Sequence, residues 1–251
     1  MRGTVIIDCF PSSVSRYHHG YAVVAVDVIR ATSTAVTAVS AGARCFPVSS
    51  LNQAYNLKEK FADALLIGEV AGELPEGFDM NNSPAKLLLR NGDLRPVIML
   101  SSSGTQLMHE CDACDAAYIG CLRNYNFLAH HLAGLFRKIA VIGAGSRGEF
   151  REEDQMCCAW LAEELLNAGY TAEGDKTMEL IQKWSGLPVE ACLTGKSASY
   201  LRSSNQLDDL EFILAHINDV PSAFMLVDGE VVPSRVLPKV GTGNSLDPVA
   251  A

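Results

Sequence analysis

The sequence predicts a three-layer α/β/α fold with a largely parallel central sheet. Apolar runs of about four to eight residues alternate with helical patterns of about ten residues along most of the chain. The runs are apolar throughout, which is typical of strands that helices cover on both faces. With 251 residues, 48% of them hydrophobic, the chain can bury one sizeable core. No linker interrupts the pattern, so we expect residues 1–251 to form a single α/β domain.

The individual elements follow from the same pattern. Strands are expected at residues 4–8, 21–27, 45–48, 64–69, 96–100, 116–120 and 139–143. Helices are expected at residues 32–41, 51–62, 84–91, 104–113, 124–135 and 151–168. After residue 170 the pattern changes to helical stretches around 175–184 and 195–215, and residues 224–232 (FMLVDGEVV) predict a hairpin or a closing pair of strands. Prolines and glycines in residues 233–251 indicate a loosely packed C-terminal arm.

Charge and composition narrow the classes of function. The formal net charge of −9, with no basic block, disfavours binding to nucleic acid or to an anionic membrane. The N-terminal apolar run is too short for a secretory signal and no stretch approaches a membrane span, so we expect a cytoplasmic protein. The eight cysteines are expected to be reduced, and Cys111 and Cys114 lack the second pair that a zinc site needs.

The turn at residues 143–148 (GAGSRG) has the spacing of a dinucleotide-binding loop. Acidic residues follow it at once, and they would repel a pyrophosphate. The turn also lies beyond the middle of the chain, whereas a dinucleotide-binding loop is expected after the first strand of a βαβ unit. We therefore do not expect NAD or FAD. The acids Glu153 and Asp154 leave two interpretations open, a metal site or a solvated helix start.

Two turns rich in hydroxyl groups follow predicted strands. Asp27 ends an apolar strand, and Arg30 and the hydroxyls of residues 32–34 follow where a helix begins. Helix N-termini favour anions, and Arg30 could add a bidentate contact, so this turn could hold a phosphate. The alternative is an Asp27–Arg30 ion pair beside an ordinary helix cap. Residues 101–105 (SSSGT) form a second such turn, without the lysine of a nucleotide-binding P-loop.

Carboxylates are expected near the same turns. Because sites in parallel sheets form beyond the carboxyl ends of the strands, Asp27, Glu69 and Asp79 should lie close to Glu153 and Asp154. Several acids beside two anion-binding turns suggest a divalent metal. Mg²⁺ prefers carboxylates together with water and phosphate oxygens, and zinc's sulfur and imidazole ligands are absent from these turns.

Six motifs in this order resemble the 2-phosphosulfolactate phosphatase family: DVIRATST, GEVAG, GFDMNNSP, SSSGT, GCLRN and GEFREED. The resemblance covers roughly residues 5–170. It implies an α/β fold and Mg²⁺-dependent hydrolysis of the phosphate ester of a 2-hydroxy acid, a step in coenzyme M biosynthesis. The chain departs from the family pattern at Ser103, where asparagine is expected, at Arg151, where a small hydroxyl residue is expected, and at Gly143, where cysteine is common.

The residues and the resemblance together give the candidate site. Expected catalytic residues are Asp27, Arg30, Glu69 and Asp154, and expected metal ligands are Asp27, Glu69 and Asp79. Expected substrate-binding residues are Thr32, Ser33, Thr34, Asn82, Ser83, Ser102, Ser103, Gly104, Thr105, Asn124 and Gly145.

Our main hypothesis is a Mg²⁺-dependent phosphatase acting on 2-phosphosulfolactate or a related phosphorylated hydroxy acid. Arg30 and the helix beginning at Thr32 would hold the phosphate, and the 101–105 turn would hold a second acidic group of this small anionic substrate. Asp27 is a metal ligand or nucleophile; metal-activated water is favoured because Ile29 breaks the DxD pattern of aspartyl-phosphate enzymes. The alternative is a non-catalytic sensor for a phosphorylated or carboxylated metabolite. The apolar composition and the arm suggest a homodimer.

Overall fold

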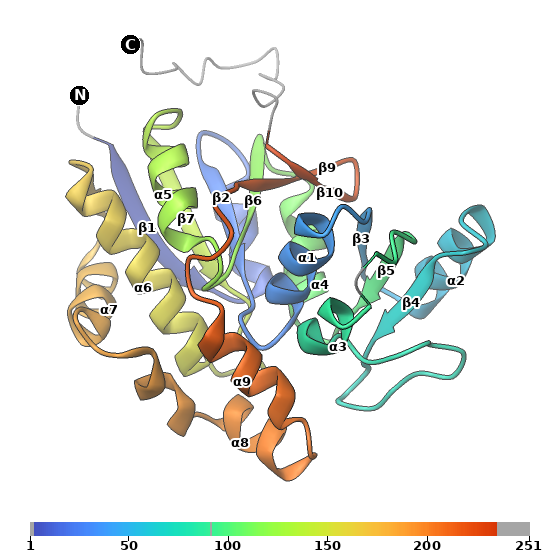
Figure 1. Cartoon of the computed structure of the whole chain (residues 1–251). Helices are drawn as coiled ribbons and strands as arrows, with labels where there is room; N and C mark the ends of the chain where they lie inside the picture. Colours follow the sequence, from blue (N-terminus) through green and yellow to red (C-terminus); the bar gives the residue numbers. More distant parts are fainter. Residues whose placement is uncertain (1–2, 91, 235–251) are drawn as a thin grey trace.

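The structure is a computed structural model that describes residues 3–90 and 92–234. These residues form a ten-stranded sheet with helices on both faces, so the predicted α/β/α class is confirmed (Figure 1). The strand order is β4-β5-β3-β10-β9-β6-β2-β7-β1-β8. The strands are β1 (Thr4–Cys9), β2 (Ala22–Val26), β3 (Cys45–Val48), β4 (Leu65–Gly68), β5 (Val97–Leu100), β6 (Ala116–Gly120), β7 (Lys138–Gly143), β8 (Thr171–Ala172), β9 (Phe224–Val227) and β10 (Glu230–Pro233).

Two parallel half-sheets make up most of this sheet. One contains β4, β5 and β3, and the other contains β6, β2, β7, β1 and β8. The β9–β10 hairpin joins them through antiparallel pairs, Met225 with Tyr118 of β6 and Val231 with Cys45 of β3. The hairpin turns at Asp228-Gly229, where both residues have positive φ, as this turn type requires. The sequence predicted the hairpin but not its position in the middle of the sheet.

The helices are α1 (Ala31–Ser40), α2 (Leu51–Lys60), α3 (Pro84–Leu88), α4 (Gly104–Cys111), α5 (Tyr125–Ala133), α6 (Glu152–Asn167), α7 (Asp175–Trp184), α8 (Lys196–Ser203) and α9 (Leu207–Ala215), with 3₁₀ turns η1 (Pro11–Arg16) and η2 (Val189–Thr194). The stretch predicted to be helical around 195–215 contains two helices, α8 and α9, which the sequence pattern did not separate. Asn205 has a φ of 56°, outside the helical region, and this ends α8 before α9 begins.

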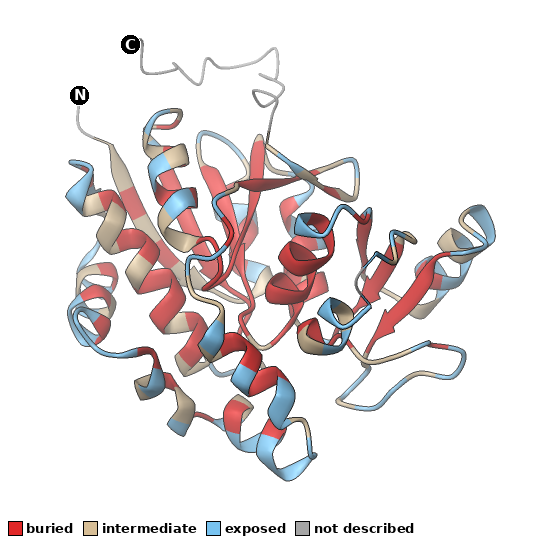
Figure 2. Ribbon diagram, viewed as in Figure 1, coloured by how far each residue is buried: buried red, intermediate tan, exposed pale blue. Residues whose placement is uncertain are grey.

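Strand side chains alternate between two apolar layers. Val24 and Val26 pack with α5 and α6 on one face, whereas Val23 and Ala25 pack with α1 and α4 on the other. Helix α2 covers a separate cluster on β3, β4 and β5. Figure 2 shows the central strands buried along nearly their whole length. Because helices cover both faces of the sheet, these strands are apolar along nearly their whole length in the sequence.

Residues 235–251 of the expected arm lie outside the described residues, and Pro233 ends β10. The homodimer stays a prediction. None of the helices in the described ranges is long and apolar enough to cross a membrane.

Candidate active site

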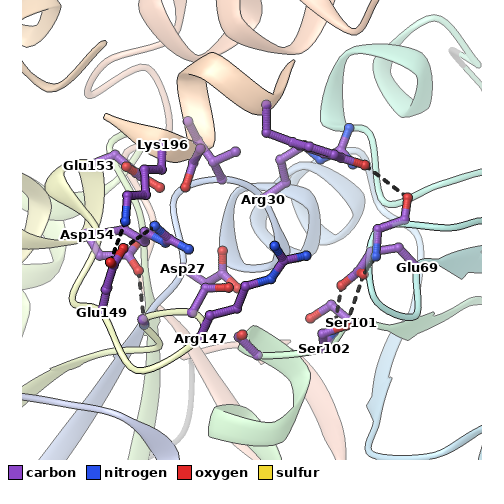
Figure 3. A pocket seen from close by; sticks show the side chains of 18 of the residues that line it. Asp27, Arg30, Glu69, Ser101, Ser102, Arg147, Glu149, Glu153, Asp154 and Lys196 are labelled. Carbon is purple, nitrogen blue, oxygen red and sulfur yellow. Dashed lines mark hydrogen bonds and ion pairs between the residues drawn. The ribbon is translucent and has the colours of Figure 1, made fainter. Parts of the chain in front are cut away.

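A cavity of about 580 Å³ opens where β2, β4, β5 and β7 end, which is where the sequence predicted the site (Figure 3). The turns after these strands supply Asp27, Glu69, Ser102 and Gly145, and α8 covers the cavity with further side chains. Its lining also includes Ile29, Arg30, Ala71, Gly72, Asn82, Ser101, Ser103, Ser146, Arg147, Glu149, Arg151, Glu153, Asp154, Lys196, Ser197, Tyr200 and Leu201.

Asp27 lies buried between the N-termini of α1 and α4. Its Oδ1 accepts a hydrogen bond from Ala31 N at 3.3 Å, and Gly104 N also donates to this carboxylate. A Cβ on Gly104 would lie 2.1 Å from Asp27 Oδ2, so only glycine allows this approach. The two helix N-termini predicted to hold substrate anions are therefore directed at a carboxylate of the protein itself.

The pKa of Asp27 is raised to about 6, mainly because burial disfavours its charged form. The negative charge of Glu69 raises it further, while the hydrogen bonds from Ala31 and Gly104 and the charge of Arg30 lower it. The two helix N-termini thus offset only part of the cost of burying this charge. Asp27 remains a carboxylate that a cation would stabilise strongly.

The three hydroxyls after Asp27 hold the turn rather than face the cavity. Thr32 Oγ1 accepts from Asp27 N at 2.9 Å and donates to Asp27 O at 2.7 Å. Ser33 Oγ donates to Val28 O, and Thr34 Oγ1 donates to Asn82 O, each at 2.7 Å. None of the three is among the lining residues, so the structure does not bring these predicted phosphate ligands into the cavity.

Glu69 occupies the second hydroxyl-rich turn. Its carboxylate accepts from Ser102 N at 2.6 Å, from Ser102 Oγ at 2.9 Å and from Gly72 N at 2.6 Å. Ser101 and Thr105 bond to each other, through Ser101 N to Thr105 Oγ1 at 2.8 Å and Thr105 N to Ser101 Oγ at 3.0 Å. The donors expected for a second acidic group of the substrate are thus largely satisfied within the protein.

Arg30 lines the cavity but is paired with Asp209 in α9, and both side chains are buried. Ser83 Oγ also donates to Asp209. The Asp27–Arg30 ion pair considered as an alternative is not formed among the described contacts, because Arg30 points to α9 instead. Asp209 was missed from the sequence, since it lies 179 positions from Arg30 in a stretch without a recognisable motif.

Glu153 and Asp154 are buried at 1% and 3% exposure, so the interpretation as a solvated helix start is wrong. Asp154 Oδ1 accepts from Val28 N at 2.8 Å and Oδ2 from Gly145 N at 3.3 Å, which ties two strand-end turns to α6. Burial raises the pKa of Glu153 to about 7. Burial, with the negative charges of Asp27 and Glu153, also raises the pKa of Asp154. Three acids thus converge at one end of the cavity.

Comparison with known proteins identifies the family. The family model described as 2-phosphosulpholactate phosphatase matches residues 9–223. The chain belongs to the 2-phosphosulpholactate phosphatase family. A probable 2-phosphosulfolactate phosphatase of Clostridium perfringens strain 13 is 30% identical over 219 residues, covering 84% of this chain and 88% of the relative. Similarly named proteins of Gloeobacter violaceus (30% over 196 residues, 76% and 83% covered) and Carboxydothermus hydrogenoformans (36% over 134 residues, 53% and 56% covered) also match.

Some of the other predicted site residues line the cavity. Asn82 does so, and its buried Oδ1 has no hydrogen-bond partner in the described structure. Gly145 lines it with a φ of 59°, and a Cβ there would lie 2.6 Å from the Phe10 ring. Ser103, one departure from the family pattern, also lines it, directly after Ser102 in the chain. These residues remain candidates for contact with a ligand.

Other predicted residues are structural in their contacts. Asp79 accepts from Leu66 N at 2.8 Å and is not among the lining residues, so the structure does not bring this predicted metal ligand to the other acids. Ser83 caps α3. Asn124 accepts from Cys121 N at 3.0 Å and donates to Ile119 O at 3.1 Å, which fixes the turn after β6. Gly143, another departure, lies under Phe150, where a Cβ would be 2.2 Å from the ring.

Four cations line the cavity, and sequence reasoning identified only Arg30 as functional. Arg151 and Lys196 both pair with Glu149. Arg147 lies within the GAGSRG turn, so its position beside the site could have been inferred from that motif. Lys196 comes from α8, in the last third of the chain, where the sequence offered no signal.

Proposed function

We propose that the protein is a Mg²⁺-dependent phosphatase that hydrolyses the phosphate ester of a small 2-hydroxy acid, 2-phosphosulfolactate or a close relative. Membership of the family and the names of its relatives support the reaction class. The observation that carries the proposal is the convergence of Asp27, Glu153 and Asp154, all buried, on a cavity of substrate size.

The carboxylates fit a divalent cation. Within residues 3–90 and 92–234, none of these three acids forms an ion pair, and Glu153 Oε2 is buried without a hydrogen-bond partner. Among all residues that the structure describes, no group of three or more His, Cys, Asp or Glu side chains is already placed to hold a metal ion. Mg²⁺ commonly takes only one or two carboxylates and completes its shell with water and phosphate oxygens. Asp27 and Asp154 are the residues that would hold it.

Bound Mg²⁺ would offset the charge of the phosphoryl oxygens and position the attacking water. Asp27 is fixed by Ala31 N and Gly104 N, so it would orient that water without moving. Glu153, with its pKa near 7, can carry a proton at neutral pH and donate it to the leaving oxygen of the ester. Glu69, one of the predicted catalytic residues, is less suited to donate a proton because its carboxylate already accepts three hydrogen bonds.

The test is phosphate release from 2-phosphosulfolactate and a panel of other phosphate esters, with EDTA and after restoring Mg²⁺. We expect EDTA to abolish release and Asp27→Asn to lower kcat by about 10³-fold or more, since a general base or metal ligand typically contributes this much. Asp79→Asn is the matched control, because its carboxylate bonds Leu66 N outside the cavity.

Two outcomes would contradict the proposal. Release that is unaffected by EDTA and undiminished in Asp27→Asn would exclude this site. Tight binding of the ester without any release, with Mg²⁺ or Mn²⁺ present, would favour the sensor instead.

A further inference from the structure

Arg147 differs from the other cations of the cavity in having no partner among residues 3–90 and 92–234. Arg30 pairs with Asp209, and Arg151 and Lys196 share Glu149. In the described part of the chain, no hydrogen bond or ion pair involves the Arg147 side chain, although it lines a cavity rich in acids. Figure 3 shows this side chain extended into the cavity. Its charge is therefore available to a ligand.

The backbone holds Arg147 in this position firmly. Ser146 N donates to Glu149 O at 2.9 Å and Glu149 N donates to Ser146 O at 3.0 Å, which closes a tight turn around Arg147. The start of the loop is fixed by Ala144 N, which donates to Val26 O at 2.7 Å, and by Gly145 N, which donates to Asp154. The base of the Arg147 side chain is thus attached to the same framework as the acids.

Arg147 also has a φ of 51°, in the left-handed region that favours glycine. Its neighbours Gly145 and Gly148 have positive φ as well, so the turn uses glycine where a side chain is not needed. A residue with a side chain is less stable in this conformation than glycine. The turn thus carries an arginine at a position where glycine would be more stable.

We propose that Arg147 determines specificity by binding the substrate's carboxylate, the acidic group that every phosphorylated 2-hydroxy acid carries beside the ester carbon. This inference rests on the proposed function. The scissile phosphate belongs at Asp27 and Asp154, where a metal would offset its charge. The 101–105 turn, predicted to hold the second acidic group, is filled by Glu69. A planar guanidinium matches a carboxylate with two parallel hydrogen bonds, and no described residue occupies the donors of Arg147.

The test compares two substrates that differ only in this group, 2-phosphoglycerate and glycerol 2-phosphate. In Arg147→Gln, kcat/KM for 2-phosphoglycerate should fall by about 10- to 100-fold, mainly through KM, because a charge-assisted contact is lost. The value for glycerol 2-phosphate should change less than about twofold, since that ester never made the contact. Arg147→Lys should retain part of the preference, and Arg16→Gln, at an exposed arginine away from the cavity, is the control.

Equal losses for both substrates would assign Arg147 to the scissile phosphate and overturn the inference, and so would no loss for either. If the wild type releases phosphate from no ester, the proposed function fails, and calorimetry tests Arg147 separately. In that case Arg147→Gln should weaken binding of 3-sulfolactate by about tenfold or more and leave 2-hydroxyethanesulfonate, which lacks the carboxylate, unchanged. Unchanged affinity for 3-sulfolactate, or no binding to the wild type, would overturn the inference.

Discussion

The turns at residues 101–105 and 143–148 each follow a parallel strand and open onto the same cavity, yet they present opposite chemistry to a ligand. The first is rich in hydroxyls and helix N–H groups, but Glu69 and Asp27 already occupy those donors. The second is flanked by acids, yet it carries Arg147, whose side chain has no partner among the described residues. The composition of a turn therefore indicates what it can bind, and distant residues decide what remains available.

The same contrast separates Arg30 from Arg147. Both are arginines in strand-end turns, but Arg30 is neutralised by a buried acid from α9, whereas Arg147 has no such partner in the described structure. Arg30 then contributes to the fold, and Arg147 remains for the ligand. Substituting Asp209, the partner of Arg30, and neutralising Arg147 therefore test whether the two arginines have these different roles.

The largest expected effect follows from removing Asp209. Asp209→Asn leaves the Arg30 guanidinium buried without its carboxylate, so the free energy of unfolding should fall by about 3–5 kcal/mol. Denaturant unfolding measures this. Asp208→Asn, at the exposed neighbour, should change it by less than about 0.5 kcal/mol, as should Arg147→Gln. A loss in Asp209→Asn no larger than in Asp208→Asn would show that Arg30 is not held by this pair.

A smaller effect is expected from filling the space between α4 and Asp27. In Gly104→Ala the new methyl would lie 2.1 Å from Asp27 Oδ2 and must displace this carboxylate. Turnover should fall by about 100-fold, because a shift of about 1 Å in a catalytic group has that consequence. Steady-state kinetics with Mg²⁺ measures it. Gly134→Ala, where the nearest atom is 3.7 Å away, is the control, and full activity in Gly104→Ala would mean that Asp27 is not positioned by α4.

The smallest effect concerns pH and Glu153. Its folded-state pKa of about 7 lies above the ordinary 4.5, so the folded protein binds more protons than the unfolded chain between these values. Stability should therefore fall as pH rises from about 4.5 to 7 and should change no further from this group above it. Glu153→Gln should make this slope shallower and raise the free energy of unfolding at pH 8 above the wild-type value. Part of the slope should remain, because the pKa values of Asp27 and Asp154 are raised as well.

Denaturant unfolding in EDTA, at several pH values, gives the comparison without a bound cation. Glu152→Gln alters the half-buried neighbouring carboxyl and serves as the control. If stability depends on pH in Glu153→Gln as it does in the wild type, the pKa of Glu153 is not raised by burial in the folded protein.

Much of the fold was predictable because burial on both faces leaves a local signature. The strand from Ala22 to Val26 is apolar throughout, and Asp27 was identified as the centre of the site because it ends that run. The residues next to Glu153 in the sequence could not show that it is buried, because its burial depends on α8, where Ser197 hydrogen-bonds to it. Asp209 and Lys196 were missed for the same reason. Local spacing predicts elements, but contacts across the chain settle which polar groups are already satisfied.

The β9–β10 hairpin has a consequence for the order in which the molecule can assemble during synthesis. In the described sheet, β3 and β6 are joined only through this hairpin, which spans residues 224–233. Each parallel half-sheet can form its own strand pairs once its residues have left the ribosome. The seam between the halves cannot close until nearly the whole described chain has been translated. A nascent chain stalled before Phe224 would therefore hold two half-sheets with open edges, exposed to pairing with other chains.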